Sequence, residues 1–136
     1  MTMRSNSKWA IGVLAALLSG PAFAGDYDGT RDLLCVPRDV VECDMAASCE
    51  RVSPVMADVP AFIRVEFKKK RLANVSGPER TTPIENVSQR DGMTILQGAQ
   101  TGRAWSIVID QVTGLLSASI ADNEGAFAIF GACTPD

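Results

Sequence analysis

Four cysteines are the residues of this chain with the clearest chemistry, and their spacing separates two possibilities. Cys35, Cys43 and Cys49 follow a C-x7-C-x5-C pattern, and Cys133 lies close to the end of the sequence. Zinc sites use closely spaced cysteine pairs, often together with histidine. This sequence has no such pair and no histidine at all. The pattern therefore favours two disulfides over a metal centre.

The first 24 residues have the features of a cleavable signal peptide. Arg4 and Lys8 precede the apolar run Trp9–Leu18, and Ala22-Phe23-Ala24 matches the small-x-small motif of a cleavage site. The run is shorter than the roughly 20 residues that span a bilayer. We therefore expect a leader at 1–24 and a single domain at 25–136, which is periplasmic or secreted and not inserted in a membrane.

An oxidising compartment makes disulfide formation the expected chemistry of the cysteines. Cys43 and Cys49 flank one short turn, and we predict that they pair with each other. Cys35 and Cys133 lie in the first and last predicted strands, and their pairing would join the two ends of the sheet.

The candidate catalytic groups each have a simpler structural interpretation. A Ser-His-Asp site lacks its base, because the sequence contains no histidine. Ser106 falls on the outward side of a predicted strand. The pairs Glu42 with Asp44 and Asp122 with Glu124 are of the kind that glycosidases use, but acids are also common in turns. We therefore predict that the protein is not an enzyme.

Asp26–Asp32 is the one stretch that resembles a calcium-binding loop. It lacks the third paired acid of such a loop, and Pro37 stands where a bidentate glutamate is required. We expect a frayed, solvated N-terminus there. No metal or other cofactor is expected.

A dense basic block and one tryptophan form the candidate binding surface. Lys68, Lys69, Lys70 and Arg71 could hold an acidic or phosphorylated partner, although a solvated turn that discourages aggregation is the simpler interpretation. Trp105 could line a ligand pocket or belong to the core.

Hydrophobic alternation predicts that residues 25–136 form an all-β domain. Phe62–Phe67 and Ala104–Asp110 have a period of two, Pro37 suggests a bulge or an edge position, and Arg90-Asp91-Gly92 indicates a hairpin. Eight or nine short strands in sequential hairpins favour a small antiparallel up-and-down barrel, with a β-sandwich as the alternative. The predicted core comprises Ile63, Val65, Phe67, Leu96, Trp105, Ile107, Ile109, Leu116, Ile120, Phe127 and Ile129.

The early C-x7-C-x5-C pattern and the segment from Gly102 to Pro135, with its A-W-S-x-x-I-D, T-G and F-G-A-C-T elements, resemble a group of uncharacterised small exported bacterial proteins. The resemblance implies a compact β fold in the periplasm, and it implies no activity.

Charge and composition favour a binding protein. The formal net charge of −3 disfavours nucleic acid as a partner. The function expected from the sequence is non-catalytic binding of an envelope or secreted protein, as an inhibitor or accessory factor. The alternative is a barrel that carries a small apolar molecule. A ligand barrel requires a hollow interior, whereas an interaction module fills its core.

Overall fold

The computed structural model describes residues 25–46 and 48–136, and the predicted leader at 1–24 lies outside the described residues. Regular structure in the described part is entirely β-strand. No helix there is long and apolar enough to cross a membrane. The strands are β1 (Leu33–Asp44), β2 (Cys49–Val52), β3 (Ile63–Glu66), β4 (Arg71–Asn74), β5 (Thr81–Pro83), β6 (Asn86–Arg90), β7 (Met93–Gln100), β8 (Arg103–Asp110), β9 (Leu115–Ala121) and β10 (Gly125–Pro135).

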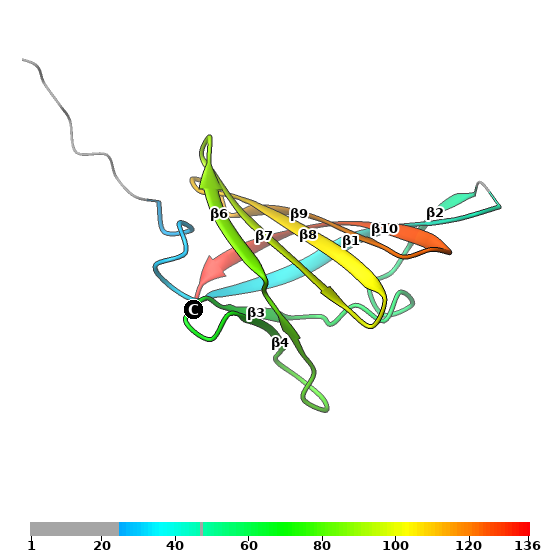
Figure 1. Cartoon of the computed structure of the whole chain (residues 1–136), viewed down its shortest axis with the longest axis horizontal. Coiled ribbons are helices and arrows are strands. Elements are labelled where there is room, and N and C mark those ends of the chain that lie inside the picture. Colours follow the sequence, from blue (N-terminus) through cyan, green and yellow to red (C-terminus); the bar gives the residue numbers. More distant parts are fainter. Residues whose placement is uncertain (1–24, 47) are drawn as a thin grey trace, which may run out of the picture.

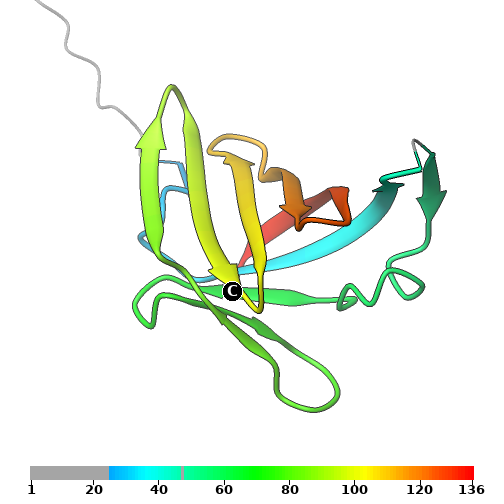
Figure 2. The same ribbon diagram turned by 45° about the vertical axis from the view of Figure 1, so that its right-hand side comes forward.

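All of these strands belong to one antiparallel sheet, with the order β5-β4-β3-β1-β10-β9-β8-β7-β6 and with β2 paired to β1 beside this path. Strands β6 to β10 form a continuous meander, and β1 lies between β10 and β3. The sheet curls into a half-barrel (Figure 1, Figure 2). The predicted all-β, antiparallel, barrel-like class is confirmed.

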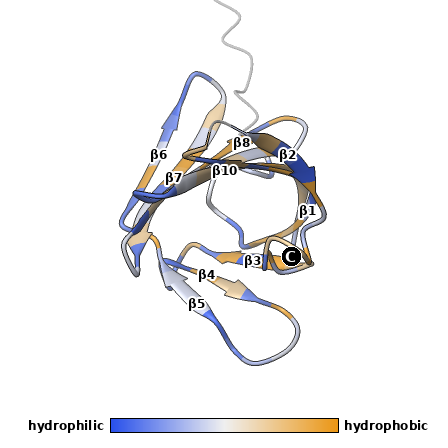
Figure 3. Ribbon diagram, turned by 90° about the vertical axis from the view of Figure 1, so that its right-hand side faces the viewer, coloured by the Kyte–Doolittle hydropathy of each residue, from blue (hydrophilic) through white to orange (hydrophobic). Residues whose placement is uncertain are grey.

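The two ends of the strand path are joined by the chain itself. Strands β5 and β6 are separated only by Ile84–Glu85 and lie at opposite ends of the order. The Glu85 amide donates to the Gln97 carbonyl at 2.9 Å. The Gln100 side chain accepts from the Thr82 hydroxyl at 2.7 Å and donates to the Thr81 carbonyl at 3.1 Å. Side chains thus link β5 to β7, and the strands curl into a ring when viewed end-on (Figure 3).

Two tight turns set the register of the meander. Asp91 and Gly92 connect β6 to β7 with φ of 54° and 78°, and Thr101 and Gly102 connect β7 to β8 with φ of 51° and 78°. Two successive positive φ values are characteristic of the type I′ hairpin turn, whose twist matches that of the strands. The first turn is predicted from the sequence. A bulge between Pro37 and Asp39 bends β1, as the proline suggests.

The core is formed by the inward faces of the strands. Among the predicted core residues, Val65, Leu96, Ile107, Ile109, Leu116 and Ile129 are buried. Leu33, Val40 and Ile84 are also buried, although they are not among the predicted core residues. Five other predicted members are only half-buried: Ile63, Phe67, Trp105, Ile120 and Phe127.

One end of the half-barrel is closed by residues 25–32. Tyr27 packs against the core, and its carbonyl accepts a hydrogen bond from the fully buried Thr94 hydroxyl at 2.6 Å. A side chain at Gly114 would collide with the Tyr27 ring, so the glycine makes room for it. Asp32 accepts from the Phe67 amide at 2.9 Å. The prediction of a frayed N-terminus is therefore wrong, because this segment packs against and hydrogen-bonds to one end of the core.

Both disulfides join residues that lie directly opposite one another on neighbouring strands. Cys35 on β1 faces Cys133 on β10, and Cys43 on β1 faces Cys49 on β2. These are the pairs expected from the sequence. The first disulfide is buried between the first and last strands, whereas the second closes a protruding hairpin.

The two disulfides should contribute unequally to stability. Their cysteines are 98 and 6 residues apart in sequence. The chain-entropy estimate gives about 4–5 kcal/mol for the longer loop and about 2 kcal/mol for the shorter one. In urea unfolding, Cys35→Ala/Cys133→Ala should therefore lose about twice the free energy of unfolding lost by Cys43→Ala/Cys49→Ala. Equal losses, or the reverse order, would contradict this expectation.

Candidate functional site

A cavity of about 640 Å³ lies inside the half-barrel, away from the end that residues 25–32 close. Its walls come from the inward faces of the sheet and from the segment 57–60, which connects β2 to β3. The apolar part of the wall includes Ile63, Trp105, Ala118, Ile120, Phe127 and Ile129. Predicted core residues that are only half-buried, namely Ile63, Trp105, Ile120 and Phe127, thus lie on the wall of this cavity.

A small side chain at one register position helps to explain why the interior is hollow here. Ala118 on β9 lies between Ile107 on β8 and Ile129 on β10 in one row across the sheet. In the next row, Gly98 on β7 faces Trp105 on β8. A Cβ atom at Gly98 would approach the indole ring to 2.5 Å, so the ring packs directly on the glycine backbone.

Trp105 is therefore both a packing residue and part of the cavity wall. It contacts the core cluster while remaining half-buried. Its indole Nε1 is buried and has no hydrogen-bond partner among the described residues. An apolar surface with a large aromatic ring is typical of pockets for small molecules.

Charged side chains at the cavity are paired with opposite charges. Arg80 on the β4–β5 hairpin donates to Asp58 at 2.9 Å, which ties this hairpin to the segment that precedes β3. Arg103 donates to Asp122 at 3.2 Å. Glu79 lies 3.7 Å from Arg71. The rim is therefore polar but has little unbalanced charge.

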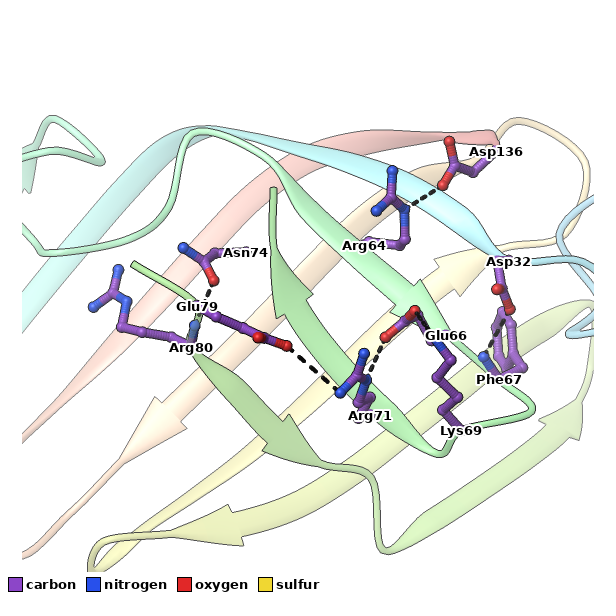
Figure 4. Close-up of polar contacts among 10 residues, drawn as sticks. All are labelled: Asp32, Arg64, Glu66, Phe67, Lys69, Arg71, Asn74, Glu79, Arg80 and Asp136. Carbon is purple, nitrogen blue, oxygen red and sulfur yellow. Dashed lines mark hydrogen bonds and ion pairs between the residues drawn. The ribbon is translucent and has the colours of Figure 1, made fainter. Parts of the chain in front are cut away.

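The basic block lies elsewhere. It occupies the β3–β4 turn and the start of β4, next to the closed end, whereas Trp105 lies on the cavity wall. Two of its four cations are bound to the buried Glu66, as Figure 4 shows: Arg71 donates to one carboxylate oxygen and Lys69 to the other, at 2.8 Å for Lys69. Lys68 and Lys70 are exposed. The residues of the candidate binding surface are thus not brought together.

Two hydrogen bonds lower the pKa of Glu66 to about 2, and the bond from Arg71 has a larger effect than the bond from Lys69. An ionised Glu66 therefore fixes the β3–β4 turn from the inside. The main role of Lys69 and Arg71 in this arrangement is structural.

The carboxylate pairs do not have the environment of a general acid. The Asp122 side chain accepts hydrogen bonds from the Glu124 amide at 2.8 Å and from the Gly125 amide at 3.0 Å. These bonds hold the pKa of Asp122 below its usual value, whereas a general acid at neutral pH requires a raised pKa. Asp44 caps the β1–β2 turn in a similar way, through the Ala46 amide at 2.9 Å.

The remaining candidates from the sequence also have ordinary structural roles. Ser106 lies on the outer face of β8, opposite Ser119. In the segment that resembles a calcium loop, Asp28 accepts from the amide and the hydroxyl of Thr30, which lowers the pKa of its carboxyl group. No cluster of three metal-ligating side chains occurs within residues 25–46 and 48–136.

Comparison of the chain with protein-family models, with curated proteins and with solved structures finds no match. The resemblance to small exported bacterial proteins therefore stays a prediction. Inferences about function rest on the cavity and on the surfaces around it.

The Glu66 cluster gives a defined pH dependence. The pKa of Glu66 is about 2 in the folded protein and ordinarily 4.5, so its stabilising effect is complete above pH 4.5 and is lost as the pH falls toward 2. Urea unfolding of the wild type and Glu66→Gln should therefore differ most above about pH 5 and converge at low pH. Glu85→Gln, at an exposed position, is the control. A difference that stays constant with pH would contradict this assignment.

Proposed function

We propose that this protein binds a small apolar molecule in the cavity of its half-barrel, and that it does so in the periplasm or after secretion. The observation that carries the proposal is the cavity itself, about 640 Å³ with a largely apolar wall. Ligand pockets typically measure about 300–1,000 Å³ and are lined mainly by apolar and aromatic side chains. A barrel that carries such a molecule fits this geometry better than a fully packed interaction module.

The surrounding fold supports a preformed site. The Cys35–Cys133 disulfide joins β1 to β10 next to the cavity, and Cys35 contributes to its wall. The packed closed end supplies a rigid base on the opposite side. A rigid pocket loses little conformational entropy when a ligand enters, which favours binding.

The compartment follows from two independent features. Two disulfides indicate folding in an oxidising, non-cytoplasmic environment. The expected leader at 1–24 would direct the chain there.

Binding without catalysis is part of the proposal. The sequence contains no histidine, and Asp122 is held in its ionised form as a turn cap. The cavity is lined by apolar side chains, by uncharged polar residues that include Thr81, Thr82 and Gln100, and by paired charges.

A second candidate function is the binding of an envelope or secreted protein, and the outer face of the sheet favours it. Leu115 and Phe130 are exposed there and line a shallow depression together with Val108. Val36 is exposed nearby, since Ala132 pairs with both Val36 and Leu115. Exposed apolar patches on small domains commonly mark sites of protein contact.

Filling the cavity should weaken ligand binding. Ala118→Phe places a large ring between Ile107 and Ile129, and it should weaken binding of N-phenylnaphthylamine, an uncharged dye that fluoresces in apolar surroundings, by about tenfold or more. Ala121→Phe, on the same strand but exposed, should bind the dye normally. Far-ultraviolet circular dichroism checks that both variants fold. A folded Ala118→Phe that binds as the wild type does, or a wild type that binds neither dye nor any co-purified molecule, would contradict the proposal.

The second candidate has its own test. Mature, oxidised protein is used as bait for an envelope fraction, and Leu115→Ser/Phe130→Ser should recover less of any specific partner than the wild type. Val112→Ser, at a highly exposed turn position, is the matched control. Equal recovery by all three proteins would exclude this face as the contact surface.

A further inference from the structure

The inward face of β8 changes from charged to apolar along its length. Side chains alternate across a strand, so Arg103, Trp105, Ile107 and Ile109 share one face. Ile107 and Ile109 are buried and Trp105 is half-buried, whereas Arg103 is exposed. Arg103, Trp105 and Ile107 all line the cavity. The cavity therefore has an apolar interior and a polar end beside the β7–β8 turn.

Hydrogen-bonding side chains from β5 and β7 continue this polar end across the sheet. Gln100 on β7 is paired with Arg103 on β8. The same Gln100 side chain accepts from the Thr82 hydroxyl and donates to the Thr81 carbonyl. All four residues line the cavity, and we call them the polar row: Thr81, Thr82, Gln100 and Arg103. The polar row lies one step along the strands from Trp105.

Asp122 orients the guanidinium of the polar row. Its Oδ1 atom accepts from the amides of Glu124 and Gly125, and its Oδ2 atom accepts from Arg103 Nε at 3.2 Å. A guanidinium carries five N–H donors, and this bond uses one of them. The fixed carboxylate therefore positions Arg103 and leaves further donors for an acceptor atom in the cavity.

The charges on the cavity wall disfavour an ionised ligand. The wall carries two acidic and two basic side chains, namely Asp58, Glu79, Arg80 and Arg103. Both arginines are already neutralised by an aspartate. A ligand carboxylate would add an unbalanced negative charge to a chain whose formal charge is −3. An uncharged hydroxyl or carbonyl oxygen can accept a hydrogen bond from Arg103 without adding charge.

We propose that the ligand is an uncharged amphiphile, with an oxygen-bearing head on the polar row and an apolar chain along Trp105 and Ile107. This inference rests on the proposed ligand-binding function, and it adds the chemical class and the orientation of the ligand. Arg103 and Ile107 are four residues apart on β8, which corresponds to about 14 Å along a strand. An extended lauryl chain matches this length. Ala118, opposite Ile107, leaves room for the end of the chain.

Displacement of N-phenylnaphthylamine by two ligands with similar apolar chains tests the head group. Monolaurin, an uncharged glycerol ester, should displace the dye from mature, oxidised protein at about tenfold lower concentration than lauric acid does at a pH where the acid is ionised. Tighter or equal binding of ionised lauric acid would overturn the inference.

Arg103→Leu tests the orientation of the ligand. It removes the guanidinium donors and keeps an apolar side chain, so monolaurin should bind about tenfold more weakly while the dye binds as it does to the wild type. Arg51→Leu removes an arginine that is paired with Asp39 on the protruding β1–β2 hairpin, and it should leave binding of both compounds unchanged. Far-ultraviolet circular dichroism checks that both variants fold. Unchanged monolaurin binding by a folded Arg103→Leu, or an equal loss in Arg51→Leu, would overturn the inference.

Dye binding separates this inference from the proposed function. A wild type that binds the dye, but from which monolaurin does not displace it, refutes the uncharged amphiphile alone. A wild type that binds neither compound refutes the proposed ligand site and this inference with it. Ala118→Phe should weaken binding of both compounds, because both occupy the cavity. Monolaurin that binds normally to a folded Ala118→Phe lies outside the cavity, and the inference is then overturned.

Discussion

The pairing of the first strand with the last is the interaction on which the rest of this fold depends. β1 and β10 are the longest strands, and they pair along almost their whole length, with one bulge between Pro37 and Asp39. This pairing places β3 to β5 on one side of β1 and the β6–β10 meander on the other. The Cys35–Cys133 disulfide lies within this pairing and fixes it covalently, across a sequence separation of 98 residues. This pairing, together with the link between β5 and β7, holds the meander and the short strands β3 to β5 around one core.

Much of this architecture could be predicted from the sequence because its signals are local. Strict alternation in Ala104–Asp110 determines which face is buried, and Asp91-Gly92 matches the turn that a hairpin requires. The pairing of Cys35 with Cys133 followed from assigning each to a terminal strand. Local patterns of this kind also identified most of the buried core residues, but they do not indicate how tightly those residues pack.

The errors and omissions arose where distant parts of the chain meet. Thr101 adopts a positive φ that β-branched residues disfavour, so the β7–β8 turn had no strong sequence signal. Tyr27 is held by Gly114 and Thr94, far away in sequence, and the segment around it therefore read as a loose terminus. The cavity was equally hidden, because Ala118 creates space only through its neighbours on adjacent strands.

The division of the interior into a packed end and a hollow end connects stability with the proposed function. At the closed end, Tyr27, Thr94 and Ile109 fill the space with buried side chains and hydrogen bonds. One row further along the strands, Ala118 leaves room that a larger side chain would occupy. Leaving that room forgoes dispersion contacts that a packed core would have. The disulfide between β1 and β10 offsets this loss. It stabilises the fold by reducing the conformational entropy of the unfolded chain, and it does not need to fill the interior. A domain stabilised in this way can hold open a cavity that side-chain packing alone would tend to close.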